Sequence, residues 1–79
     1  MRPRAINVKV LPDYQLLITF DNDELKIFDV KPYLQYPQFA TLKDPTMFST
    51  VKIDGLSIAW ENGADICPDE LYYNSKKQK

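Results

Sequence analysis

The stretch VKIDGLSIAW, residues 51–60, is the clearest indication of how this chain folds. Two short runs rich in β-branched and aromatic residues flank the pair Asp54-Gly55. An Asp-Gly pair favours a type I′ turn, because both central residues of that turn need positive φ angles. We therefore predict an antiparallel hairpin with strands at 51–53 and 56–60.

Upstream of this hairpin, residues 5–11 alternate between apolar and polar side chains. Ile6, Val8 and Val10 fall on one face, and this period of two residues is typical of a half-buried strand. Turn-forming residues follow at 12–14, where proline fixes φ and aspartate bonds its own backbone. The sequence therefore predicts a first strand that ends before residue 12.

Residues 15–20 and 24–28 are rich in β-forming residues and are separated by the polar triplet 21–23. This arrangement predicts a tight hairpin between a second and a third strand. The turn contains no glycine, although hairpin turns commonly need a residue with positive φ. We expect Asp23 to be replaceable by glycine with a gain in stability.

Helical signals fill the gap between the two hairpins. Prolines and aromatic residues between 32 and 42 predict one or two short helical turns, and Asp44-Pro45 predicts a capped helix over about 45–50. Pro68, followed by Asp69 and Glu70, predicts a last helical turn. The aromatic cluster Tyr33, Tyr36 and Phe39 fits either core cover or an interaction surface.

Together these elements predict a single α+β domain over residues 1–79. We expect a curved antiparallel sheet of about five strands, in the order β-β-β-α-β-β-α, with short helices packed on one face. A chain of 79 residues that is 44% hydrophobic and 13% aromatic has a real core but thin stability. Residues of about 1–4 and 76–79 are expected to be flexible termini.

Charge is balanced overall but uneven along the chain. Ten lysines and arginines stand against eleven acids, so no global field attracts nucleic acid or an anionic membrane. Residues 53–75 nevertheless carry five acids and no base. These acids are Asp54, Glu61, Asp65, Asp69 and Glu70. This part of the chain is therefore expected to form an acidic surface that suits a basic partner.

The cysteine count and the hydropathy of the chain indicate where in the cell the protein is expected. A single cysteine forms no internal disulfide, whereas small secreted domains usually need several. The longest uninterrupted aliphatic run is only residues 16–18, and the start of the chain does not look like a signal peptide. We therefore expect a cytoplasmic protein with no membrane partner.

Several chemistries find no support in the sequence. Histidine is absent, which removes the usual general base and imidazole metal ligand, and Cys67 is expected to be a small buried hydrophobe. The two glycines are explained by turns and make no phosphate-binding loop. Asp65, Asp69 and Glu70 match no known metal loop, so helix capping by the last two is favoured. We expect no enzyme activity, no cofactor and no bound metal.

Residues 60–72, with the sequence WENGADICPDELY, combine with FDNDE at 20–24 and Lys43-Asp44-Pro45 to form a recognisable set. The chain resembles the bacterial family named domain of unknown function 2442, over nearly its whole length. The resemblance implies a compact α+β domain like the N-terminal domain of the Nitrosomonas protein that typifies the superfamily. It also implies a small protein often encoded beside another, in some cases like a toxin–antitoxin pair.

Three functions remain open at this point. The first is a protein-interaction module, with an antitoxin-like or regulatory role, that binds another protein, basic or encoded nearby, or itself. Its candidate surface comprises Trp60, Glu61, Asn62, Asp65, Asp69, Glu70 and Tyr72. The second is a DNA-associated module, since Arg2 and Arg4 form a short basic arm and some family members precede a helix-turn-helix domain. The third is a small-ligand domain around Asp65, Glu70, Tyr72 and Trp60.

Nucleic acid is the less expected partner, because the chain offers no basic recognition helix. The segment 60–72 also has a purely structural interpretation. Trp60 ends a strand as a core anchor whose indole N–H needs a partner, which the following loop could supply. The segment is therefore expected to hold the fold together first, and to bind a partner second.

Overall fold

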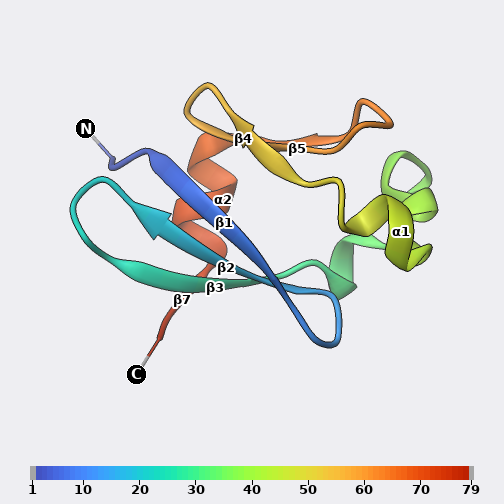
Figure 1. Ribbon diagram of the computed structural model, residues 1–79, viewed down its shortest axis with the longest axis horizontal. Helices are drawn as coiled ribbons and strands as arrows, with labels where there is room; N and C mark the ends of the chain where they lie inside the picture. Colours follow the sequence, from blue (N-terminus) through green and yellow to red (C-terminus); the bar gives the residue numbers. More distant parts are fainter. Residues whose placement is uncertain (1, 79) are drawn as a thin grey trace.

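The computed structural model describes residues 2–78 and combines two antiparallel sheets with short helices (Figure 1). The strands of the first sheet lie in the order β1-β2-β3-β7 and those of the second in the order β4-β5-β6. Their bounds are β1 Ala5–Leu11, β2 Gln15–Phe20, β3 Leu25–Asp29, β4 Lys52–Asp54, β5 Ser57–Ala59, β6 Asp65–Ile66 and β7 Lys76–Lys77. The α+β class is confirmed, but the strands divide between two sheets where a single curved sheet was expected.

The helical segments lie where the proline and capping signals predict them. They are η1 Lys31–Tyr33, η2 Pro37–Lys43, α1 Pro45–Phe48 and α2 Pro68–Asn74, the first two being 3₁₀ helices. The Asp44 carboxylate caps α1 by accepting a hydrogen bond from the Thr46 N–H at 3.1 Å. In Figure 1 the segment from η1 to α1 gathers at one end of the molecule, while α2 packs against β3 and β5.

The core lies between the two sheets and α2. β2 and β3 point alternate side chains inward, and the inward residues include the fully buried Phe20 and Phe28. The same alternation places Lys26 on the inner face, where it is only 8% exposed. Its Nζ donates to the Tyr72 carbonyl at 2.9 Å and lies 3.7 Å from the centre of the Tyr72 ring. This lysine therefore ties β3 to α2 and does not point into solvent.

The prediction that Ile6, Val8 and Val10 share a buried face is wrong for two of the three. A register shift between Ala5 and Asn7 inserts an extra residue into β1, so Ala5 is buried and Ile6 is 49% exposed. Val10, near the end of the edge strand β1, is 38% exposed. Val8 alone packs partly against the core as expected.

The hairpin of β4 and β5 forms, but its turn lies one residue further along than predicted. Asp54 pairs with Ser57, so the two loop residues are Gly55 and Leu56. Gly55 has φ +60°, and neither Asp54 nor Leu56 has a positive φ. A positive φ at the first central residue alone is the pattern of a type II′ turn, which corrects the expected type I′.

The β2–β3 turn supports the expectation for Asp23, whose φ is +71°. The Asp23 N–H bonds the Phe20 carbonyl, and the Phe20 N–H bonds the Glu24 carbonyl, which closes a three-residue loop. Asp23→Gly should therefore raise the free energy of unfolding by about 0.5 kcal/mol, a melting shift of about 2 to 4 °C. Thermal melts check this, with Gly55→Ala as the control that should lose stability. A loss in the Asp23 variant would contradict this assignment.

The described parts of both termini make specific contacts. Arg2 Nε lies 2.9 Å from Asp69 Oδ1, and Lys76 and Lys77 pair with β3 as strand β7. Terminal position was the ground for expecting a flexible end at 76–79, and a two-residue strand has no alternation by which the sequence could reveal it. Met1 and Lys79 lie outside the described residues.

Candidate functional site

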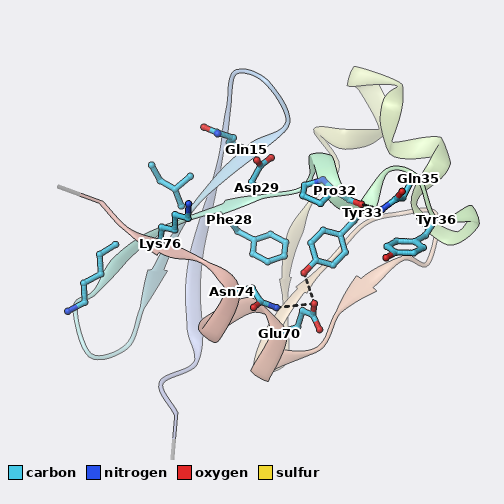
Figure 2. A pocket seen from close by; sticks show the side chains of 12 residues that line it. Gln15, Phe28, Asp29, Pro32, Tyr33, Gln35, Tyr36, Glu70, Asn74 and Lys76 are labelled. Atoms are coloured by element: carbon cyan, nitrogen blue, oxygen red, sulfur yellow. Dashed lines mark hydrogen bonds between the residues drawn. The ribbon is translucent and has the colours of Figure 1, made fainter.

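A surface groove lies where η1, α2 and the ends of β3 and β6 meet, and it consists of two adjoining hollows. The larger has a volume of about 650 Å³ and the smaller about 250 Å³. Tyr33, Tyr36 and Glu70 line both hollows and so join them. The larger hollow also includes Phe28, Asp29, Lys76 and Lys77 (Figure 2), and the smaller also includes Phe39, Asp65, Ile66 and Cys67. We call the two hollows together the groove.

A hydrogen-bonded trio forms the centre of the groove. The Tyr33 hydroxyl donates to Glu70 Oε2 at 2.5 Å, and Asn74 Nδ2 donates to the same oxygen at 3.0 Å. Figure 2 shows Tyr33 on η1 and Glu70 on α2 pointing toward one another. Glu70 and Asn74 lie four residues apart on α2 and so share one face of the helix. These bonds fix the position of η1 relative to α2.

Aromatic packing holds the ring of Tyr33 in place. Its centre lies 5.3 Å from that of Phe28 and 5.8 Å from that of Phe39, the second in an edge-to-face arrangement. Tyr36, in contrast, is 48% exposed. The aromatic cluster is therefore divided: Phe39 is buried and covers the core, while Tyr36 offers its side chain to solvent, and its role as an interaction surface stays a prediction.

Burial, together with the Glu70 carboxylate, raises the pKa of Tyr33 to about 12. Removal from water disfavours the phenolate, and the hydrogen bond to Glu70 requires the protonated hydroxyl. Tyr33 therefore remains a neutral donor throughout the physiological range.

This pKa predicts how stability responds to alkaline pH. Because the folded pKa lies above the ordinary value of 10.0, Tyr33 contributes stability that is complete below pH 10 and is lost as pH rises toward 12. Absorbance titration of tyrosinate should show a component that ionises near pH 12. Tyr33→Phe should remove that component, and its persistence in the variant would assign it to another tyrosine.

The two hollows differ in charge. Asp65 and Glu70 line the smaller hollow, whose lining includes no lysine or arginine, whereas the larger hollow contains both signs, with Lys76 and Lys77 beside Asp29 and Glu70. No ion pair within residues 2–78 involves Asp65 or Glu70. The smaller hollow therefore carries negative charge that the described protein does not neutralise.

The structure separates the seven residues of the predicted interaction surface. Trp60 is 2% exposed, and its indole Nε1 donates to the Phe48 carbonyl at 3.0 Å, so α1 supplies the partner expected from the following loop. Tyr72 is half-buried, and its hydroxyl donates to Glu24. Neither residue lines the groove. Trp60 acts as the predicted core anchor and contributes no surface.

The other five candidates are exposed but serve different contacts. Glu61 and Asn62 lie in the turn after β5, where the Asn62 amide donates to Thr41 Oγ1. Asp69 pairs with Arg2. Asp65 and Glu70 alone come together at one hollow. The sequence did not identify Tyr33 as the partner of Glu70, since 37 residues separate the two.

The sequence expectation for Cys67 is wrong, because this residue is exposed and lines the smaller hollow. It follows β6 directly and precedes Pro68, so it is the N-cap position of α2 and does not face the core. Within residues 2–78, no three metal-ligating side chains lie close enough together to hold a metal ion. The described helices are also all too short or too polar to cross a membrane.

The fold and the groove define a small α+β domain of two antiparallel sheets with an open, aromatic and partly acidic surface groove. A family model described as "Protein of unknown function (DUF2442)" matches residues 5–77. The chain therefore belongs to this family, which confirms the resemblance seen in its residues. Searches of curated proteins and of solved structures found no significant match. The likeness to the Nitrosomonas domain thus stays a prediction.

Proposed function

We propose that this chain is a protein-interaction module and that the groove is its binding surface. The observation that supports this most is the pair of adjoining hollows joined by Tyr33, Tyr36 and Glu70. Exposed tyrosine beside polar groups with spare bonding capacity is typical of protein interfaces. The trio of Tyr33, Glu70 and Asn74 holds the groove in shape, which lowers the entropic cost of binding.

The partner that the family resemblance favours is a small neighbouring protein, with this chain in an antitoxin-like or regulatory role. The proposal includes that the chain is not an enzyme. No histidine is present, so the one cysteine lacks the base that usually activates a thiol. The groove residues are therefore assigned to recognition and not to catalysis.

A DNA-associated role is the weaker alternative. Arg2 is engaged by Asp69, and Arg4 Nε lies 3.6 Å from Asp21 Oδ2. Arginines held by the domain's own acids are less able to neutralise phosphates. A small-ligand site formed by Asp65, Glu70, Tyr72 and Trp60 is also a weaker alternative. Trp60 and Tyr72 lie outside the hollows that contain the two acids.

Site-specific photo-crosslinking in the native host tests the proposal. A photoreactive phenylalanine analogue at Tyr36 should capture one defined protein, identified by mass spectrometry. The same analogue at Leu56, which is exposed in the β4–β5 turn outside the groove, should not capture it. Purified partner should then bind the chain, and Tyr36→Ala should weaken binding. Equal capture from both positions, or capture of no protein from Tyr36, would overturn the proposal.

A further inference from the structure

We infer, resting on the proposed function, that the smaller hollow receives a cationic side chain of the partner, a lysine or an arginine. Its lining includes two acidic residues, Asp65 and Glu70, together with Tyr36, and no basic residue. The occupant that complements this lining in charge is a cation with an apolar stem. Lysine and arginine combine these two properties in one side chain.

Both carboxylates have bonding capacity to spare. The two hydrogen bonds to Glu70 within residues 2–78, from Tyr33 and Asn74, go to Oε2, which leaves Oε1 for a ligand. Asp65 accepts no side-chain hydrogen bond within the same residues and lies on β6 at the edge of the second sheet. An ammonium or guanidinium group that reaches both residues therefore replaces its water ligands with charge-assisted hydrogen bonds.

Aromatic rings supply the remainder of the recognition. Tyr36 is 48% exposed at the join between the hollows, and a cation over a tyrosine face gains about 0.5 to 1 kcal/mol at an exposed site. Phe39 and Ile66 also line the hollow and can pack against a methylene stem. A metal ion fits less well, because no third metal-ligating side chain joins Asp65 and Glu70 in residues 2–78.

The rest of the groove sets a direction for the bound segment. Lys76 and Lys77 line the larger hollow, and Figure 2 shows Lys76 and Tyr36 at opposite ends of it. A segment with its base over Asp65 meets no lysine in the smaller hollow. The reverse orientation is less favourable, because it would bring the base into the hollow that contains Lys76 and Lys77 as well as Asp29.

A titration with two peptides tests this inference on the full chain. The probes are a capped tetra-lysine peptide and the same peptide with every lysine acetylated, followed by amide NMR shifts. Tetra-lysine should shift the amides of Tyr36, Asp65, Ile66 and Glu70, and the acetylated peptide should not. Asp65→Asn should weaken tetra-lysine binding about threefold or more. Asp54→Asn, an equal charge change at an exposed residue outside the groove, should leave it unchanged.

Equal binding of the acetylated peptide, or equal weakening by Asp54→Asn and Asp65→Asn, would overturn the inference. The thermal melt of Asp65→Asn should match that of the unaltered chain, since Asp65 is exposed. The two proposals also fail separately. A partner captured at Tyr36 that binds the Asp65→Asn variant normally leaves the interaction function standing and removes the cation site. If tetra-lysine binding depends on Asp65 but no partner is captured, the cation site stands and the interaction function is removed.

Discussion

Trp60→Ala should remove about 3 to 5 kcal/mol of the free energy of unfolding, a large share of what a domain of this size has. Trp60 is 2% exposed and packs against Phe39 and Phe48, with ring centres 6.4 and 6.2 Å away. Alanine leaves a large cavity and also leaves the Phe48 carbonyl without the indole donor. Urea denaturation measures the loss. Unfolding is followed by circular dichroism, because the variant has no tryptophan whose fluorescence could report it.

Trp60→Phe separates the two causes of this loss. Phenylalanine keeps much of the aromatic volume but lacks the N–H group, so a smaller loss of about 1 to 3 kcal/mol is expected. Tyr36→Ala provides the control for removing an aromatic ring from the surface, and it should cost less than about 0.5 kcal/mol. If Trp60→Ala cost no more than Tyr36→Ala, the role of Trp60 as a core anchor would be refuted.

Leu71→Ala is the second change with a large expected effect, a loss of about 2 to 5 kcal/mol. Leu71 is 0% exposed and is the buried residue of α2, the helix that contacts both β3 and β5. The loss should extend to the groove, because α2 also positions Glu70 and Asn74 beneath Tyr33. Urea denaturation and tetra-lysine titration below the unfolding transition measure the two effects.

Tyr73→Ala is the matched control for this change, since it places alanine in the same helix. Tyr73 is 67% exposed, so its loss should leave both stability and peptide binding close to those of the unaltered chain. Equal effects of the two substitutions would show that helix propensity and not docking of Leu71 governs the stability of α2.

The groove was only partly predictable from the sequence. Its acidic side chains were visible, because Asp65 and Glu70 lie in the base-free segment 53–75. The aromatic cluster around Tyr33 was also visible, but its contact with α2 was not. A hydrogen bond such as that from Tyr33 to Glu70 depends on how two helices are placed by the core, and no local pattern reports that placement.

Local chemistry in the sequence determined the elements of this protein. A run of β-forming residues marked β2, proline and Asp44 marked the start of α1, and the polar triplet marked the turn at Asp23. These signals act over a few residues, through backbone sterics, helix capping and the period of the side chains. They can therefore be recognised in the sequence alone.

Only the tertiary structure decided how the elements combine, and the segment 60–72 illustrates this. Its separation into a buried Trp60, the groove residues Asp65 and Glu70, and a half-buried Tyr72 follows from where β6 and α2 pack. The two-residue strands β6 and β7 form because their neighbours offer unpaired edges, not because of their own residues. Pairing and packing between distant segments therefore decided the division into two sheets and the groove where they meet.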